Sequence, residues 1–242
     1  MAPKIITPHL KLPIQFEEKR LLSELKQILT SKWIPHFNSS IYEGAWTSLS
    51  LYARGGDEHN IFAQENNAAS LKETPILANC PYIKEVIQRF ECPLLSVRLL
   101  RLGAGGIINP HRDDRLGYED GCFRLHIPIL TNPEVEFLLN GDRLDMASGE
   151  CWYTNVNYTH SVANRGTTDR IHLVIDCERN IWSDQIFFSL APEESFQPTY
   201  NQHKDEEWER IIAELQNMDV PSAPALIDQL RKQRFAGESP KS

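Results

Sequence analysis

The segment from Ser96 to Cys177 constrains the fold most, because it is a series of short strand-like runs separated by turn residues. The runs are rich in β-branched and aromatic residues and are bounded by Gly, Pro or Asn, as strands usually are. Asn140 and Gly141 lie between two apolar runs and form the strongest short-range hairpin signal. Several short strands joined by turns predict a β-sandwich or barrel. The runs are SVRLLRL, CFRLHIPIL, VEFLL, ECWYT and RIHLVIDC.

Helices are predicted before and after this β region. Apolar residues recur at helical spacing in FEEKRLLSELKQILTSKW, and a second short helix is predicted from Ile83 to Phe90, so the first third of the chain reads as helical. Beyond Asp176 the chain turns irregular and then helical again around Trp208, and the final FAGESPKS is expected to be disordered. We therefore predict a β domain with N-terminal helices over residues 1–180 and a helical C-terminal extension with a disordered tail over residues 181–242.

The composition excludes several classes of protein. A net charge of -8 and a pI near 5.5 leave no basic stripe for phosphates, which argues against a nucleic-acid partner. No apolar run approaches the length that spans a bilayer, and the N-terminus lacks the apolar stretch of a signal peptide. We therefore expect a cytoplasmic protein without a membrane partner. The 5 cysteines are odd in number and form no CxxC pair, which predicts neither a disulfide framework nor a zinc knuckle.

The segment NPHRDD contains the first candidate metal ligands, His111 and Asp113. Residues two apart in an extended strand point to the same side, so both side chains can face one ion. His160, in NYTHSV, must come from a different strand and completes a set of two imidazoles and one carboxylate. This set suits non-haem Fe(II), because it leaves room for a bidentate 2-oxo acid and O₂. Zinc hydrolases also use two histidines and a carboxylate, so the ligands alone leave both metals open.

Arg170 favours iron over zinc. It follows His160 by about ten positions and opens the strand-like run RIHLVIDC. A guanidinium at this point can hold the distal carboxylate of 2-oxoglutarate through two hydrogen bonds, while the 2-oxo end chelates the iron. The alternative interpretation is that Arg170 is a sheet-edge arginine paired with Asp169 or Asp176.

Two of the strand-like runs share the pattern Arg-x-His-aliphatic, from Arg124 to Ile127 and from Arg170 to Leu173. In each strand Arg and His lie on one face and the aliphatic residues on the other. If the strands are adjacent, they place four basic groups in one barrel lumen, an environment that suits a dicarboxylate. We interpret His126 and His172 as buried histidines with hydrogen-bond partners rather than as iron ligands.

The segments RLGAGGIINPHRD, FRLHIPI and SGECWYTNVNYTHSVANRGTTDRIHLVIDC together resemble the aspartyl/asparaginyl β-hydroxylase family of 2-oxoglutarate dioxygenases. That family has a similar glycine-containing approach to a Pro-His pair, then an Arg-x-His-Leu strand. A Gly-Glu strand follows, leading to a second histidine with an arginine about ten residues later. GAWTSLSLY, around Trp46, also resembles the segment before its barrel. The resemblance covers roughly Trp46 to Cys177.

This resemblance implies a mainly β fold, a double-stranded β-helix (jelly roll, cupin-like) with flanking N- and C-terminal helices. It implies a reaction that uses Fe(II), O₂ and the cosubstrate 2-oxoglutarate, releases succinate and CO₂, and hydroxylates a substrate. It matches the following residues to functional positions of the family: His111 and His160 to the metal histidines, Arg170 to the cosubstrate arginine, and Arg124 and His126 to residues near the cosubstrate.

The best-known branch of the family acts on protein Asp and Asn and has Gly where this chain has Asp113. In this respect the chain is more similar to the small bacterial members, such as the free-proline cis-hydroxylases. We therefore expect an amino acid, free or in a small peptide, as substrate. Arg112 and Arg115 are candidate carboxylate contacts, as is Arg124, and Trp46, otherwise a core residue, is a further candidate contact.

The loop that follows these arginines contains LGYEDG and is a candidate lid over the site. The alternative is an exposed charged loop whose arginines pair with Asp114, Glu119 and Asp120. Two other functions also stay open. One is β-hydroxylation of Asp or Asn residues in a protein or ribosomal peptide, and the other is a cupin-like metal-binding protein without oxygenase activity.

Overall fold

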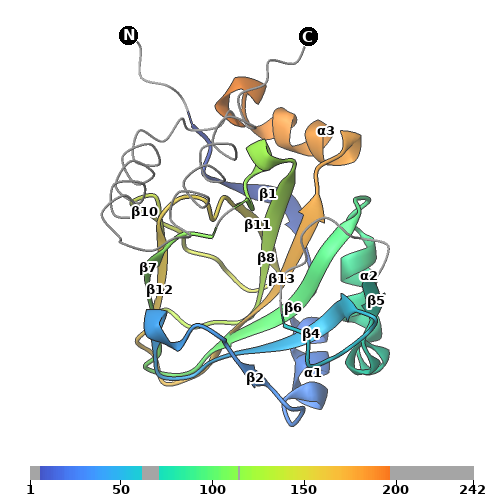
Figure 1. Cartoon of the computed structure of the whole chain (residues 1–242), viewed down its shortest axis with the longest axis vertical. Helices are drawn as coiled ribbons and strands as arrows, with labels where there is room; N and C mark the ends of the chain where they lie inside the picture. The colour runs from blue at the N-terminus through green and yellow to red at the C-terminus, as the bar shows by residue number, and fades with distance from the viewer. Residues whose placement is uncertain (1–5, 62–70, 114, 197–242) are drawn as a thin grey trace, which may run out of the picture. The chain divides into compact units, whose positions relative to one another are not determined.

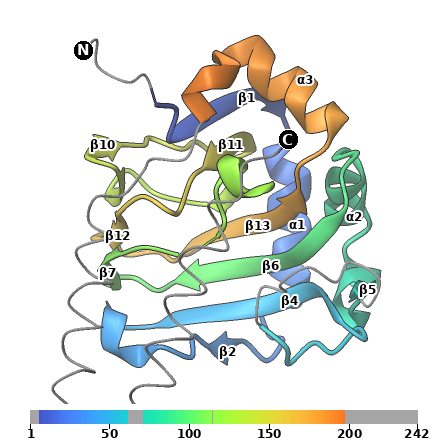
Figure 2. The ribbon, with the colours of Figure 1, turned by 45° about the horizontal axis from the view of Figure 1, so that its top comes forward.

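The computed structural model describes residues 6–61, 71–113 and 115–196, and they confirm a mainly β fold built from two antiparallel sheets (Figures 1 and 2). The strands of the larger sheet are β1 (His9–Gln15), β2 (Ile34–Pro35), β4 (Trp46–Arg54), β5 (Leu71–Glu73), β6 (Leu94–Leu102), β8 (Cys122–Leu130), β11 (Glu150–Thr154) and β13 (Arg170–Glu178). The strands of the smaller sheet are β3 (Tyr42–Glu43), β7 (Ile107–His111), β9 (Val135–Leu139), β10 (Asp142–Arg143) and β12 (His160–Asn164). Within the described ranges the larger sheet has the order β1-β11-β8-β13-β6-β4-β2, with β5 paired to β4, and the smaller has the order β10-β9-β12-β7-β3.

The larger sheet has an aliphatic face and a polar face, because side chains alternate along its strands. On the central strand β13, Leu173 and Ile175 are fully buried in a core that also contains residues of the flanking helices. Arg170, His172 and Asp176 occupy the alternate positions of β13 and lie on the opposite face, toward the smaller sheet. The helices are α1 (Glu18–Ile28), α2 (Pro81–Gln88) and α3 (Ile181–Leu190), with 3-10 turns η1 (Ser39–Ile41), η3 (Pro75–Asn79), η4 (Tyr118–Asp120) and η5 (Glu193–Phe196).

Helices α1 and α2 pack on the aliphatic face and are joined by a buried carboxylate. The apolar stripe of α1 includes the fully buried Leu21 and Leu25. Glu24, on the same helix, accepts hydrogen bonds from the backbone N–H groups of Tyr82 and Ile83, at 2.7 and 2.8 Å. These N–H groups belong to the first turn of α2, where a carboxylate satisfies unpaired donors and interacts favourably with the helix dipole. The predicted helices at both places are confirmed.

The predicted hairpin at Asn140 and Gly141 is also confirmed. Both residues have positive φ, 52° and 91°, as a two-residue type I′ turn requires. They connect β9 to β10, with Asp142 paired to Leu139.

The interpretation of the first third as helical is wrong, because it also contains strands of the larger sheet. β4, which includes most of GAWTSLSLY, pairs with β6 and is part of the barrel rather than a segment before it. β1 pairs with β11 at the other edge. The periodicity argument looked only for helical spacing in this region and therefore did not detect these strands.

Directly after β13, where the sequence predicted an irregular stretch before the helix around Trp208, the chain instead forms α3, which buries Phe187 in the core of the larger sheet. The predicted boundary at residue 180 stays a prediction. The predicted helix around Trp208 and the tail FAGESPKS lie outside the described residues. No helix in the part of the chain that the structure describes is long and apolar enough to cross a membrane.

Candidate metal centre

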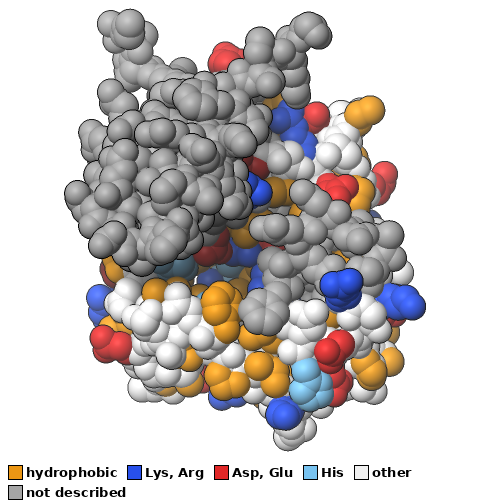
Figure 3. All heavy atoms as spheres, in the orientation of Figure 1, with side chains coloured by type: hydrophobic (Ala, Val, Ile, Leu, Met, Phe, Trp, Pro, Cys, Tyr) orange, Lys and Arg blue, Asp and Glu red, His pale blue; other side chains and the backbone are white. Residues whose placement is uncertain are grey.

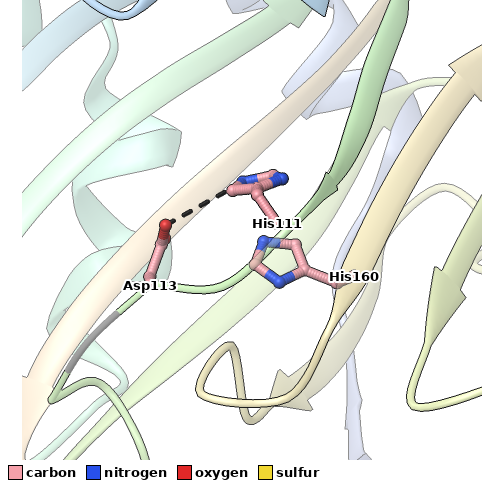
Figure 4. Close-up of side chains that lie close together, drawn as sticks. All are labelled: His111, Asp113 and His160. Carbon is pink, nitrogen blue, oxygen red and sulfur yellow. Dashed lines mark ion pairs between the residues drawn. The ribbon is translucent and has the colours of Figure 1, made fainter. Parts of the chain in front are cut away.

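Two neighbouring strands of the smaller sheet bring the candidate histidines together. His111 is the last residue of β7 and His160 is the first residue of β12, and the antiparallel register places them opposite each other. Their ring centroids lie 4.2 Å apart (Figure 4). The prediction that His160 comes from a different strand is therefore confirmed.

The local backbone determines which ring nitrogen of each histidine is free. Nδ1 of His111 lies 2.8 Å from the carbonyl oxygen of Asn109, and Nδ1 of His160 lies 3.1 Å from that of Tyr158. Because a carbonyl oxygen only accepts, each Nδ1 carries a proton and donates it, and in the neutral ring Nε2 keeps its lone pair for a metal. Burial, and then the neighbouring His111, lower the pKa of His160 to about 4, so this ring is neutral near pH 7.

Asp113 reaches the histidines from a loop rather than from a strand. β7 ends at His111, and the backbone N–H of Asp113 donates to the carbonyl oxygen of Val156 at 2.9 Å. The expectation that strand alternation aligns His111 with Asp113 is therefore wrong, but the side chains still converge: Oδ1 of Asp113 lies 3.9 Å from Nε2 of His111. The candidate ligand atoms of His111, Asp113 and His160 all lie within 4.8 Å of one another (Figure 4). Two imidazoles and one carboxylate on one side fit non-haem Fe(II) and leave its other side open to ligands.

The three side chains line a cavity of about 560 Å³ between the sheets. Figure 3 shows a recess on this face, with basic, acidic and histidine side chains inside it. A small molecule of the size of an amino acid together with a dicarboxylate fits a cavity of this volume. Besides the ligands, its lining includes Arg170, Arg124, His126, Trp46, Arg98, His36, Phe137 and Arg112.

Arg170 is a buried cation without a carboxylate partner among the described residues. It is 2% exposed, and NH2 contacts Nδ1 of His172 at 2.9 Å, while Nε has no hydrogen-bond partner. Burial lowers the pKa of Arg170. The alternative pairing with Asp169 or Asp176 is wrong, because Asp169 pairs with Arg101 at 2.7 Å and Asp176 pairs with other arginines. A buried charge with an unsatisfied donor indicates a place for an anionic ligand.

Arg124 lines the same cavity but has carboxylate partners on two sides. Its NH1 donates to Oδ2 of Asp113 at 2.6 Å, and its Nε donates to Oδ1 of Asp176 at 2.7 Å. Burial alone would raise the pKa of Asp113, but Arg124 more than compensates, so the pKa lies below its usual range and the carboxylate is ionised. The predicted contacts of Arg124 with the cosubstrate or a substrate carboxylate stay predictions.

His126 and His172 lie on adjacent strands in the barrel interior, an arrangement that their shared pattern left open. β8 pairs with β13, and the two imidazole centroids are 5.6 Å apart. His172 has the expected hydrogen-bond partner, Arg170, whereas Nδ1 of His126 has none among the described residues. Burial, and then Arg170, lower the pKa values of both histidines well below the ordinary value, so both are neutral. His126 therefore offers the cavity a neutral imidazole with an unsatisfied nitrogen.

The structure separates the other three candidate substrate contacts. Trp46 lines the cavity, and its ring stacks on His36 with a centroid distance of 3.6 Å. Arg112 lies at the cavity edge, where its Nε donates to Oγ1 of Thr159 at 2.9 Å. Arg115 is exposed and is not among the residues that line the cavity.

The segment LGYEDG does not have the character of a mobile lid. Tyr118 in this segment is fully buried, and its ring stacks on Phe187 of α3 at 4.3 Å. Its hydroxyl donates to Asp184 at 2.6 Å. Glu119, expected as an arginine partner, instead accepts from the side-chain amide of Asn155 at 2.8 Å. The lid expectation is therefore wrong for the described part of this loop, which is fixed to α3.

Sequence reasoning missed four residues at the cavity: His36, Arg98, Phe137 and, behind Arg124, Asp176. Arg98 and Asp176 occupy the polar face of β6 and β13, so the alternation that identified Arg170 also pointed to them. Phe137 lies 5.7 Å from the guanidinium of Arg170, and only the packing of the two sheets brings it there. His36 follows the two-residue strand β2, for which the sequence offers no signal.

A model of the aspartyl/asparaginyl beta-hydroxylase family matches residues 15–180, which is more than half of the chain. The chain belongs to this family. The matched range includes the whole barrel from β4 to β13, and with it all three candidate metal ligands and Arg170. The family resemblance proposed from the sequence motifs is thereby confirmed.

Known relatives of this beta-hydroxylase family member include the L-proline cis-4-hydroxylase of Rhizobium meliloti (strain 1021), 28% identical over 167 residues that cover 68% of this chain and 59% of the relative. The chain thus matches less than two thirds of that relative's length. Among solved structures, an oxidoreductase of the 2OG-Fe(II) oxygenase family from Burkholderia pseudomallei is similar with a TM-score of 0.47 and 15% identity over 72% of this chain and 86% of that one. A prolyl-4-hydroxylase from Pseudomonas putida has a TM-score of 0.43 and 11% identity over 72% and 93%.

Proposed function

We propose that this protein is an Fe(II)- and 2-oxoglutarate-dependent dioxygenase that hydroxylates an amino acid, free or in a small peptide. The observation that carries the proposal is Arg170, a buried cation without a carboxylate partner among the described residues, in the same cavity as the His111, Asp113 and His160 cluster. A buried charge is costly unless it is paired, so an anionic ligand is expected at Arg170. 2-Oxoglutarate has a distal carboxylate for this arginine and a 2-oxo acid end for the metal.

The protein's own groups have defined tasks in this reaction. His111, Asp113 and His160 would hold the ion, and Arg170 would orient the cosubstrate. The bound iron would supply O₂ activation coupled to decarboxylation of 2-oxoglutarate to succinate and CO₂. The buried rings of Trp46 and Phe137 line the cavity and would limit the access of water to it.

The charges around the cavity favour a substrate with a carboxylate. In the described part of the chain, the buried guanidinium groups of Arg98, Arg124 and Arg170 face only two buried or half-buried carboxylates, Asp113 and Asp176. A divalent ion raises the excess positive charge from one to three, and a dicarboxylate cosubstrate compensates two of these. One positive charge is left for the carboxylate of an amino acid.

An apolar and aromatic part of the cavity lining includes Trp46, Ile108 and Val162. It suits the side chain of an amino acid rather than a second charged group. The similarity to an L-proline cis-4-hydroxylase supports a free amino acid as substrate. Arg112 and Trp46 are the contacts that we propose for the substrate, and Arg115 is dropped because it lies away from the cavity lining.

The test is succinate formation from 2-oxoglutarate by the purified protein with Fe(II), in the presence of each of the twenty amino acids. The proposal predicts that one or a few amino acids stimulate succinate release and gain the mass of one oxygen atom. The matched controls are His160→Ala, which removes a ligand, and Asp169→Asn, which changes a carboxylate outside the cavity. Stimulation by Asp- or Asn-containing peptides alone would favour the protein-hydroxylase alternative. Metal binding without any 2-oxoglutarate turnover would favour a non-oxygenase metal protein.

A further inference from the structure

The polar face of the larger sheet contains a buried carboxylate that lies outside the candidate ligand set. Asp176, on the central strand β13, is fully buried. The register places it opposite Arg124 on β8 and Ser96 on β6. It accepts hydrogen bonds from Oγ of Ser96 at 2.8 Å and from NH2 of Arg98 at 2.9 Å. Two more come from Nε and NH2 of Arg124, at 2.7 and 3.2 Å, so both of its oxygens are occupied.

Arg124 connects this carboxylate to the candidate metal ligand. One edge of its planar guanidinium meets Asp176, and NH1 meets Oδ2 of Asp113 at 2.6 Å. The other oxygen of Asp113, Oδ1, is the one that lies 3.9 Å from Nε2 of His111. A planar fork held along one edge cannot rotate, so the direction of NH1 is fixed. The orientation of the Asp113 carboxylate is fixed in turn.

We propose that Asp176 is a positioning residue for the metal centre: it holds Arg124 so that this arginine takes one oxygen of Asp113 and leaves the other for the ion. The inference rests on the proposed metal site. Its physical basis is competition for charge. Asp176 shares the positive charge of Arg124, and without Asp176 that charge would fall on Asp113 alone, which would then be less available to a cation.

A purely structural role is the competing explanation, because Asp176 also neutralises two buried arginines. Both roles predict that Asp176→Asn lowers stability. The two roles give different predictions for the double variant Asp176→Asn/Arg98→Met, in which the lost negative charge is matched by a lost positive charge. This double variant restores the charge balance and leaves Arg124 without its second carboxylate. A structural role predicts recovery of both folding and metal binding, whereas a positioning role predicts recovery of folding only.

The experiment is a calorimetric titration of the metal-free full chain with Ni²⁺, together with the visible absorption spectrum of the Co²⁺ form, which reports ligand geometry. In the double variant we expect a dissociation constant for Ni²⁺ raised by roughly ten- to a hundredfold, as for other residues that orient metal ligands, and an altered Co²⁺ spectrum. The melting temperature should lie near that of the wild type. Arg124→Lys keeps the charge but loses the fork, and should show the same loss of affinity.

Asp169→Asn is the matched control, because Asp169 immediately precedes β13 and pairs with an arginine of β6, Arg101, away from the cavity lining. It should bind Ni²⁺ as the wild type does. A wild-type affinity in the double variant would overturn the inference. If the double variant does not fold, the result with Arg124→Lys decides. Absence of Ni²⁺ binding in the wild type itself would instead refute the proposed metal site, so the two failures are distinguishable.

Discussion

The two ends of the polar face of β13 differ in how their charges are balanced. At one end, Arg170 has a neutral histidine as its hydrogen-bond partner and no carboxylate within the described chain. At the other end, Asp176 has two arginines, and one of them contacts a further carboxylate, Asp113. Both ends are equally buried, so solvent access does not explain the difference.

This contrast distinguishes a place for a ligand from a support. A buried charge without a partner of opposite charge indicates that a ligand supplies this partner. A buried charge that the protein itself neutralises instead maintains the geometry of its neighbours. The barrel thus has a receptive end at Arg170 and an internally compensated end at Asp176. Four predictions test or refine this distinction.

The largest effect is expected at the compensated end. Asp176→Asn leaves Arg98 and Arg124 facing one carboxylate, and breaking a buried ion cluster costs on the order of 3–5 kcal/mol of unfolding free energy. Urea unfolding of the metal-free protein measures it. Arg170→Met is the matched substitution at the receptive end and should cost little or even stabilise, since it removes an unpaired buried charge. Equal losses from the two variants would abolish the distinction.

The second-largest effect is on 2-oxoglutarate binding, and here the substitution of Arg170, not that of Asp176, should have the larger effect. Arg170→Met should weaken 2-oxoglutarate binding by about 2–5 kcal/mol, because it removes one partner of a desolvated charge pair. Calorimetry with Ni²⁺ in place of iron measures both affinities, and Ni²⁺ binding should be unchanged. If the variant binds 2-oxoglutarate as the wild type does, Arg170 is not the anchor.

A change of pH should affect the histidines before it affects Asp176. The folded-state pKa of His160 is lowered to about 4, below the ordinary value near 6.5, so the unfolded chain takes up the proton first. Its contribution to stability is present above pH 6.5 and is lost as the pH falls toward 4, at up to about 1.4 kcal/mol per pH unit. Despite its burial, Asp176 stays ionised in this window, because Arg124 and Arg98 keep its pKa far below the ordinary value.

Unfolding of the metal-free protein at pH values between 7 and 4 checks this expectation, with His160→Gln as the comparison. The variant should show a flatter dependence on pH. An identical slope in both proteins would mean that His160 is not the group that titrates.

The smallest effect concerns the two exposed arginines after β7. Arg112→Ala should raise KM for the amino-acid substrate about two- to fivefold, because an exposed charge contributes at most about 1 kcal/mol. Arg115→Ala should leave KM unchanged, since Arg115 is not among the cavity-lining residues. Steady-state kinetics of the two variants decide the matter, with succinate release in the absence of substrate as a control. A larger effect from Arg115 would reverse the assignment made from the geometry.

The polar face of β13 also indicates how far the sequence could be interpreted on its own. Alternation along RIHLVIDC and CFRLHIPIL correctly predicted two strands with Arg and His on one face, because a two-residue period is a local property. That the two strands are adjacent is a finding of the structure. The candidate ligands His111 and His160 were identifiable because residue type and spacing restrict metal sites strongly. Asp176 lay in the same alternation and was considered only as a partner of Arg170, because nothing local indicated that Arg98 and Arg124 would be its partners.

Other features depend on contacts that are distant in the sequence. β4 was not recognised as a strand of the barrel, because its pairing with β6 spans some fifty residues and a helix. The lid expectation failed because the ring that fixes Tyr118 belongs to α3, far along the chain. One oxygen of Asp113 likewise accepts a hydrogen bond from Arg124, which no spacing rule connects to it.

The hydrogen bonds from Nδ1 of His111 and His160 end on main-chain carbonyl oxygens two residues earlier in the chain. Main-chain carbonyls are present whatever amino acid occupies a position, so no side-chain substitution at Asn109 or Tyr158 deletes these acceptors. The orientation of both imidazoles is therefore determined by the course of the main chain, and mutation of the other cavity-lining side chains does not remove it. The orientation of the metal histidines can therefore be kept when evolution, natural or directed, substitutes the cavity-lining side chains to accept a different amino acid.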